Sequence, residues 1–313
     1  MLVSSALISG LGLGSMYGLL ALGFHVTYAV SNTVNFAQGS MLMLGAVLCF
    51  TVWVTFGWPL SAAVPIALLG CAACGILVER LAVRPFVERG SNSWLMATVA
   101  LGIVLDNVVL FAFGKDPRGM PPGVLTTRAF SIAGIRIQYL QAMIPVVGVV
   151  IAASLQILCQ STRVGKALLA VVQNKDAARL MGINVERFIV GAYALSGCLA
   201  GITGILVAPL FTISSTMGTL FGIKAFAVAI LGGINNAWGV VVAGLVYGVA
   251  ETLITAMLGS TYTPYGQNNY RTLGAFDVRR VAASPLPFFM KNRLIVFERA
   301  AAANARLSNR ARQ

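Results

Sequence analysis

Charged residues are absent from the first 78 positions of this chain, and His25 is the only histidine among all 313 residues. Only 10% of the residues are charged, whereas 58% are hydrophobic and the mean hydropathy is +0.85. A water-soluble domain of this composition would expose large apolar patches. The scarcity of charge therefore excludes an ordinary soluble protein and predicts an all-α, polytopic bundle of transmembrane helices. No basic segment precedes the first apolar run, so we expect no cleaved signal peptide.

Patterns typical of catalysis and metal binding are also scarce. The five cysteines lie in or beside apolar runs, and the Cys-x-x-Cys pair, Cys71 and Cys74, has no second pair and no histidine nearby. We expect buried free thiols rather than a redox or metal site. One histidine with scattered cysteines disfavours an intramembrane enzyme. The chain has no Gly-x-x-x-x-Gly-Lys-Ser/Thr loop, so it is not predicted to bind ATP, Mg²⁺ or another cofactor itself.

Eight apolar runs approach the length needed to cross about 30 Å of hydrocarbon at about 1.5 Å per residue. They fall at about residues 4–29, 36–56, 60–78, 94–113, 139–159, 188–210, 220–234 and 238–258. A polar patch at 31–35 separates the first two runs, and a glycine- and asparagine-containing stretch at 232–236 follows the seventh. Both are too short for ordinary loops, so we expect broken or re-entrant helices at these places.

Basic residues indicate which loops face the cytoplasm. The loop 79–92 carries three arginines, and the segment 160–187 carries five lysines and arginines. By the positive-inside rule both face the cytoplasm. Alternation of eight spans then places the proline- and glycine-rich loop 114–138, and both termini, outside. We divide the chain into a transmembrane domain, residues 1–260, which includes the cytoplasmic loop 160–187, and an atypical basic tail, residues 261–313.

The segment 162–184, called the elbow below, is amphipathic although it lies between long apolar runs. Its sequence predicts two short helices that meet at residues 174–176, with Asp176 as the N-cap of the second helix and Gly182 as its left-handed stop. One apolar side is predicted to contain Leu168, Val172, Leu180 and Met181. Such a side requires a hydrophobic groove on another protein. The elbow therefore predicts a docking surface for a cytosolic partner.

Four ionisable side chains lie inside apolar runs, where each costs about 2.5–3.5 kcal/mol to insert. These are His25, Asp106, Lys224 and Glu251. Asp106 needs a buried donor, such as Lys224 or an asparagine of another helix, and belongs either to a structural polar pair or to the pore lining. Lys224 can also extend to the membrane surface, and Glu251 can meet another subunit. His25 is expected to be hydrogen-bonded near the membrane surface. Two acids far apart in the sequence disfavour a proton-coupled carrier.

The most informative intramembrane cluster is the sequence Asn-Phe-Ala-Gln-Gly-Ser at residues 35–40. A helix that starts here would direct unpaired N–H groups and the positive end of its dipole towards the middle of the bilayer. There it could hold an anionic or zwitterionic solute. The alternative is that Asn35 simply caps an ordinary span. The sequence leaves both interpretations open.

Six segments, spread in order over about residues 8–260, carry a family resemblance. They are 14–23, 34–39 with 43–46, 79–85, 162–184, 222–233 and 239–251, and include Glu-Arg-Leu-Ala-Val-Arg-Pro and Gly-Ile-Lys-Ala-Phe. In these segments the chain resembles the permease subunits of branched-chain amino acid ABC importers of the LivH type. The resemblance implies a multi-pass protein of the bacterial inner membrane. It also implies that the elbow sits in a cleft of an ATPase subunit.

The resemblance further implies partners and site residues. Similar importers combine two homologous permeases with two cytosolic ATP-binding subunits, which use ATP and Mg²⁺, and a periplasmic solute-binding protein. Membrane lipid is expected to contact the chain, and nucleic acid is not. The predicted ATPase-coupling residues are Arg163, Gly165, Lys166, Asp176, Ala177, Leu180, Met181 and Gly182. The predicted substrate path contains Asn35, Phe36, Gln38, Gly39, Asp106 and Lys224.

The chain also departs from the family pattern. The family usually has His-Gly-Glu where this chain has Gln-Gly-Ser at 38–40, and usually Gln where this chain has Asp106. After Tyr262 the family continues into one more span, whereas this chain has an arginine- and alanine-rich tail with nine basic residues. On the predicted topology these residues would lie outside, against the positive-inside rule. We interpret the tail 261–313 as the product of a frameshift that replaces a final helix; the alternative is a divergent tail that binds anionic lipid.

The leading hypothesis is thus a permease that moves branched-chain amino acids, or related small amino acids and amides, between itself and a partner permease. The alternative is a stand-alone channel or secondary carrier for small neutral solutes. A channel or carrier would need no segment that fills a groove on a cytosolic ATPase, so the elbow favours the importer.

Overall fold

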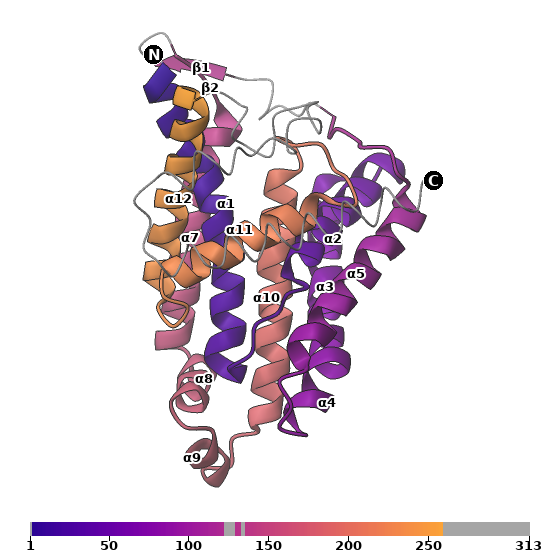
Figure 1. Cartoon of the computed structure of the whole chain (residues 1–313), viewed down its shortest axis with the longest axis vertical. Coiled ribbons are helices and arrows are strands. Elements are labelled where there is room, and N and C mark those ends of the chain that lie inside the picture. Colours follow the sequence, from indigo (N-terminus) through magenta and orange to yellow (C-terminus); the bar gives the residue numbers. More distant parts are fainter. Residues whose placement is uncertain (1, 122–128, 133–134, 259–313) are drawn as a thin grey trace, which may run out of the picture. The chain divides into compact units, whose positions relative to one another are not determined.

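The computed structural model describes residues 2–121, 129–132 and 135–258 (Figure 1). These residues form a helical bundle, and the prediction of an all-α membrane protein is confirmed. One short antiparallel hairpin, β1 (Ala129–Ile132) and β2 (Ile135–Gln138), lies in the loop that precedes α7. The tail 261–313 lies outside the described residues, so the frameshift remains a prediction.

Eight helices make up most of the bundle, and five shorter helical segments continue or connect them within the described residues. The eight are α1 (Leu2–Ser31), α2 (Gln38–Phe50), α3 (Leu60–Val78), α5 (Trp94–Phe113), α7 (Tyr139–Ser161), α10 (Val185–Val207), α11 (Met217–Leu231) and α12 (Ala237–Leu258). The shorter segments are the π-helices η1 (Thr51–Thr55) and η2 (Glu79–Val83) and the α-helices α4 (Arg84–Val87), α8 (Arg163–Gln173) and α9 (Lys175–Leu180). η1 continues α2, while η2 and α4 continue α3.

Seven helices of the described chain, counted with their continuations, are long and apolar enough to cross a membrane. The eighth predicted segment is α11, whose 15 residues reach only about 22 Å. Figure 1 shows α11 lying obliquely across the bundle. It is therefore a partial span, in keeping with the broken or re-entrant segment expected at this place. α12 runs back to the end of the bundle at which α11 starts. The last turns of α12 therefore lie beside the first turns of α1, where Thr252 Oγ1 donates to Ala6 O at 2.8 Å.

The break predicted after the first apolar run is confirmed. α1 ends at Ser31, Asn32 has a φ of 61°, and regular helix resumes only at Gln38. Gln38 is fully buried and contacts Ser196 in the middle of α10. α2 therefore begins inside the bundle rather than at its surface.

Glycine allows the central helices to approach closely. On α1, Gly10, Gly14 and Gly18 face the backbone of α12, and Gly244 and Gly248 of α12 face α1 in return. A Cβ atom at Gly14 or Gly248 would collide with the backbone of the opposite helix. Small residues that let backbones approach are the usual basis of helix packing in membranes.

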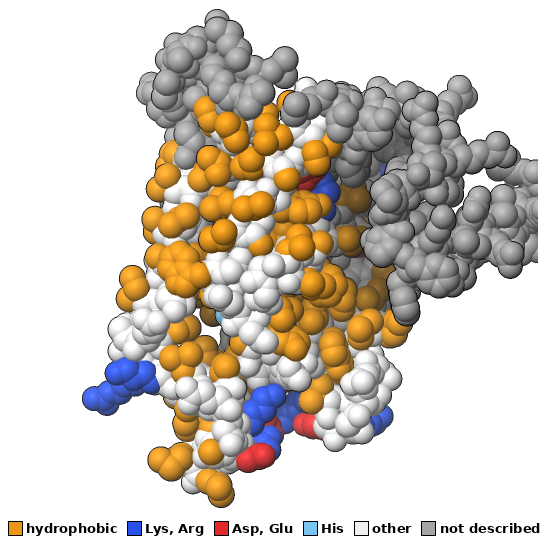
Figure 2. Space-filling view, turned by 60° about the vertical axis from the view of Figure 1, so that its left-hand side comes forward, with side chains coloured by type: hydrophobic (Ala, Val, Ile, Leu, Met, Phe, Trp, Pro, Cys, Tyr) orange, Lys and Arg blue, Asp and Glu red, His pale blue; other side chains and the backbone are white. Residues whose placement is uncertain are grey.

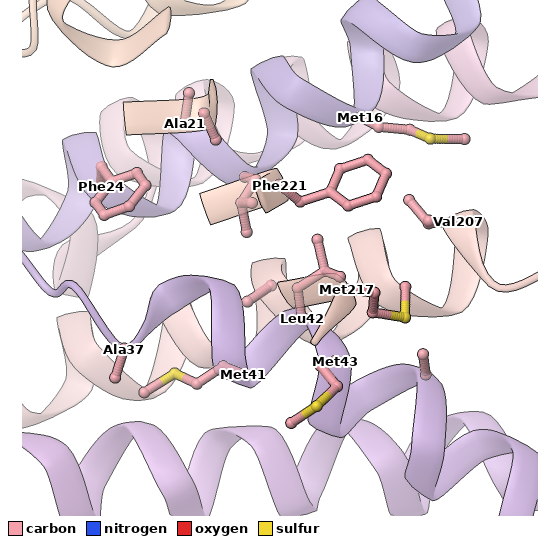
Figure 3. Close-up of a cluster of buried hydrophobic side chains, with 14 of the residues drawn as sticks. Met16, Ala21, Phe24, Ala37, Met41, Leu42, Met43, Val207, Met217 and Phe221 are labelled. Atoms are coloured by element: carbon pink, nitrogen blue, oxygen red, sulfur yellow. The ribbon is translucent and has the colours of Figure 1, made fainter. Parts of the chain in front are cut away.

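The largest apolar core lies where α1, α2, α10 and α11 converge. Figure 3 shows Met16 and Phe24 of α1, Met43 of α2 and Phe221 of α11 as members of this cluster, which lies between these helices. By contrast, α5, α7 and α12 each bury only 17% of their spanning windows. Figure 2 shows hydrophobic side chains covering one flank of the molecule, as expected for a surface in contact with lipid. All five cysteines are free, as predicted; three of them are buried, whereas Cys159 and Cys198 are half-buried.

Candidate functional site

The elbow lies at one end of the bundle, where it joins α7 to α10 (Figure 1). The segment after α3, which comprises η2 and α4, lies at the same end of the bundle. This is shown by the contact between Arg84 Nη2 and Glu186 Oε2 of α10, at 2.5 Å. Figure 2 shows lysine and arginine side chains gathered at this end. The two loops predicted to face the cytoplasm therefore lie together.

Side-chain caps begin each helix around the elbow. The hydroxyl of Thr162 accepts a hydrogen bond from Gly165 N at 2.9 Å and starts α8. The carboxamide oxygen of Asn174 accepts from the backbone of the first turn of α9, at 3.0 and 3.1 Å. The prediction that Asp176 caps this helix is wrong. Asn174 has the extended backbone of an N-cap (φ −155°, ψ 108°), whereas Asp176 already lies inside the helix.

The predicted stop at Gly182 is confirmed. Gly182 has a φ of +83°, a left-handed conformation that glycine adopts without a steric cost. Its N–H donates to Arg179 O, and the N–H of Ile183 donates to Ala178 O, both at 3.0 Å. This pair of bonds is the Schellman arrangement that ends a helix. The elbow therefore has a defined fold.

The inner side of the elbow is fixed to the bundle. Val171 and Ala178 are buried with Val30 of α1 and Val185 of α10, and Leu168 packs against this cluster. Leu168 therefore faces the bundle, and its predicted place on the docking side is wrong. Gly165 is also buried, because it packs directly against the backbone of α7. A side chain at this position would collide with that backbone.

The outer side of the elbow is exposed and apolar at its tip. Leu180 is 89% exposed and Met181 is 82% exposed, while Val172 is 39% exposed. The other predicted coupling residues, Gly165 excepted, are exposed as well: Arg163, Lys166, Asp176, Ala177 and Gly182. Two large apolar side chains held out on a rigid turn form a surface that a groove on another protein can cover.

Lys175 ties the elbow to the end of α1, because its Nζ donates to Ser31 O at 3.2 Å. We expect Lys175→Ala to remove this hydrogen bond, at a cost of about 1 kcal/mol. Hydrogen exchange of amides in 163–183 should then accelerate about fivefold. Lys166→Ala, at an exposed position of α8, is the matched control and should change little. Equal exchange in the two variants would contradict an anchoring role for Lys175.

The same lysine gives the elbow a dependence on pH. Burial lowers the pKa of Lys175 below its ordinary value of 10.5, and the neighbouring Arg179 lowers it further. The folded elbow therefore binds this proton less tightly than the unfolded chain does. The stability of the elbow is therefore lower at a pH below the pKa that Lys175 has in the folded state. It rises as the pH increases from that value to about 10.5, the ordinary pKa of lysine.

The predicted substrate-path residues near the start of α2 are packed within the bundle. Gln38 Nε2 donates to Ser196 O at 3.0 Å, and Ser196 Oγ donates to Gln38 Oε1 at 2.8 Å. Asn35 Oδ1 accepts from Ala37 N at 3.1 Å, so Asn35 stabilises the turn before α2 without being its N-cap. Phe36 packs on Phe226 of α11. These residues link α1, α2, α10 and α11, and their place in a substrate path stays a prediction.

Gly39 and Lys224, also predicted for the substrate path, take part in two different contacts of α11. The backbone of Gly39 touches that of Gly218. Lys224 forms an ion pair with Glu251 of α12 and donates to the hydroxyl of Tyr17 at 3.2 Å. The lysine side chain is only 11% exposed, so it does not extend to the membrane surface, and Glu251 has its partner within this chain.

Asp106 has different neighbours from those predicted. Lys224 pairs with Glu251 rather than with Asp106, because α12 lies beside α11. Asp106 Oδ2 instead accepts a hydrogen bond from Thr219 Oγ1 at 3.4 Å. Oδ1 of the same carboxyl group is buried and has no hydrogen-bond partner among the described residues. The predicted hydrogen bond of His25 is confirmed, since its Nδ1 lies 2.7 Å from Ile234 O.

Sequence reasoning missed the hydroxyl groups that hold the broken helix. Ser196 bridges Gln38 and Gly23 O, and Tyr193 contacts Thr33 Oγ1 at 2.7 Å. Serine, threonine and tyrosine are common in membrane helices, so their presence in an apolar run gives no signal. In the part of the chain that the structure describes, no group of His, Cys, Asp and Glu could hold a metal ion.

Comparison with known proteins identifies the family. Residues 6–273 match the family described as branched-chain amino acid transport system / permease component. The high-affinity branched-chain amino acid transport system permease protein BraD of Pseudomonas aeruginosa is 30% identical over 270 residues, which cover 82% of this chain and 87% of that protein. The corresponding LivH of Escherichia coli K12 is 30% identical over 268 residues, with the same coverage.

An archaeal relative is similar to the same extent. The probable branched-chain amino acid transport permease protein LivH of Methanocaldococcus jannaschii is 31% identical over 253 residues, or 78% of each chain. No solved structure matches this one. The family match, the matching relatives and the seven apolar helices agree, and the chain belongs to the family of membrane-embedded permease components of branched-chain amino acid transport systems.

Proposed function

We propose that this chain is the permease subunit of an ATP-driven importer for branched-chain amino acids or related small amino acids and amides. It would work in the inner membrane with a second homologous permease, two cytosolic ATP-binding subunits and a periplasmic solute-binding protein. The observation that carries the proposal is the elbow: a capped, anchored pair of helices that presents Leu180 and Met181 outwards. The named functions of the relatives support the solute class.

The fold offers a route by which motion of the elbow can reach the membrane. The elbow leads directly into α10, which packs against α1, α2 and α3. In the middle of α10, Ser196 contacts Gln38 at the start of α2 and the carbonyl of Gly23 on α1. A displacement of the elbow by an ATPase would therefore shift α10 and change the contacts at the broken helix. This is our proposed link between ATP hydrolysis and alternating access.

The proposal is tested by solute uptake into vesicles that contain the full chain with the partner subunits encoded near it. We expect L-leucine to accumulate above its external concentration only when ATP and the ATPase subunits are both present. Omission of the ATPase subunits is the control. A stand-alone channel would let leucine equilibrate without ATP, and that result would contradict the importer.

A further inference from the structure

Asp106 is a carboxylate inside the apolar helix α5 without a cation from the described part of the chain. No lysine or arginine there lies within ion-pair distance of it, and Lys224 pairs with Glu251. The hydrogen bond that it accepts from Thr219 is long at 3.4 Å. Charged groups inside a membrane are expensive and are usually paired. A buried oxygen with no partner among the described residues, Asp106 Oδ1, therefore requires an explanation.

Two helices, α11 and α2, place hydroxyl groups near this carboxyl group of α5. Thr219 belongs to α11 and donates to Asp106, and Ser40 of α2 contacts α5 at Gly102, one turn before Asp106. The hydroxyl of Ser40 donates to Gly102 O on α5 at 3.2 Å, so its lone pairs remain available as acceptors. The site thus combines one carboxylate with two hydroxyl oxygens. A primary ammonium group, with three N–H donors and one positive charge, matches such a set of acceptors.

The position of the site suits a small solute better than a neighbouring protein. Asp106 Oδ1 is enclosed by this chain's own atoms, so a helix of another subunit packed on the outside could not reach it. α5 packs chiefly on α2 and η2 and has little contact with α11, apart from the bond to Thr219. The seam between α5 and α11 can therefore open without disrupting a large interface.

The site also lies far from the elbow. Asp106 is seven residues before the end of α5 at Phe113, or about 10 Å along the helix. That end of α5 is opposite the end at which α8 and α9 lie (Figure 1). A solute delivered to the outer face would meet this carboxylate early in its passage.

We propose that Asp106, with Ser40 and Thr219, binds the ammonium group of an amino acid during its passage. This inference rests on the proposed function and makes it more specific. Opening of the seam between α5 and α11 would admit the solute to the carboxylate, and closure would hold it there. Asp106 is then the residue that favours solutes carrying a primary ammonium group.

The test uses the full chain with its partner subunits in vesicles, with radiolabelled L-leucine as the probe. Asp106→Asn should lower the maximal rate of ATP-driven uptake at least tenfold. The leucine concentration at half-maximal rate, which the soluble binding protein sets, should stay within twofold. Hydrolysis of ATP stimulated by the loaded binding protein should also stay within twofold, because the elbow is unchanged. Asp106→Glu should restore part of the uptake, and Asp116→Asn, at an exposed acid beyond α5, is the matched control.

The outcomes separate this inference from the proposed function. Wild-type uptake that is unchanged by Asp106→Asn would mean that the acid is a neutral structural group, and would overturn this inference alone. A variant that loses subunit assembly and ATP hydrolysis together with uptake would also overturn it, since Asp106 would then be structural. Absence of ATP-driven uptake in the wild type would contradict the proposed function itself.

Discussion

Replacement of Leu180 and Met181 together by aspartate is expected to abolish capture of the ATPase subunits by this chain. Both side chains are more than 80% exposed, so the change leaves the fold of the elbow intact. Burial of each in a partner groove would contribute about 1.5–3 kcal/mol, and two such anchors correspond to roughly a 100-fold loss of affinity or more. Co-purification with the ATPase subunits, followed by measurement of the dissociation constant, checks this result.

The matched control for this prediction is Val87→Asp. Val87 lies on α4 at the same end of the bundle, is 43% exposed and belongs to no part of the elbow. This control should retain capture. If Leu180→Asp with Met181→Asp bound the ATPase as tightly as the wild type, docking through the elbow tip would be excluded. If Val87→Asp also lost binding, the interface would have to extend beyond the elbow.

The sequence was sufficient to predict the spans and the two breaks, because an apolar run of about 20 residues has few stable alternatives to a membrane helix. It was also sufficient for the elbow and its stop at Gly182, where a glycine follows an amphipathic helix. The cap was misassigned because Asn174 and Asp176 are both good N-cap residues. Only backbone geometry, extended at Asn174 and helical at Asp176, distinguishes them.

Pairings between distant residues could not be predicted. The sequence offers two possible ion-pair partners for Lys224, Asp106 and Glu251. Sequence patterns alone do not indicate which helices are neighbours. The structure places α11 beside α12, so Lys224 meets Glu251 and leaves Asp106 to Thr219. Leu168 was misplaced for a similar reason. An amphipathic helix shows which residues are apolar, but only the packing of α8 against α1 and α10 decides which of them face inwards.

We expect the largest effect on stability from a substitution in the close contact between α1 and α12, called the α1–α12 seam. Gly248→Val would place a branched side chain where the Cα and N atoms of Gly14 now lie. Because the obstacle is backbone, a change of rotamer cannot relieve the collision, and the two helices must separate along their length. We expect a loss of at least about 3 kcal/mol of unfolding free energy, more than overpacking usually costs. The measurement is the fraction of monodisperse protein in detergent together with its thermal midpoint.

Gly191→Val provides the control for the seam. Gly191 lies in α10, where a Cβ atom would have no neighbour within 4 Å, and its φ is not positive, so valine fits there without displacing backbone. This variant should therefore fold as the wild type does, although valine has the same volume and helix propensity at both positions. Equal stability of the two variants would contradict a seam that depends on glycine. A selective loss at Gly248 would establish that close approach of α1 holds α12, and with α12 the Glu251 partner of Lys224, in place.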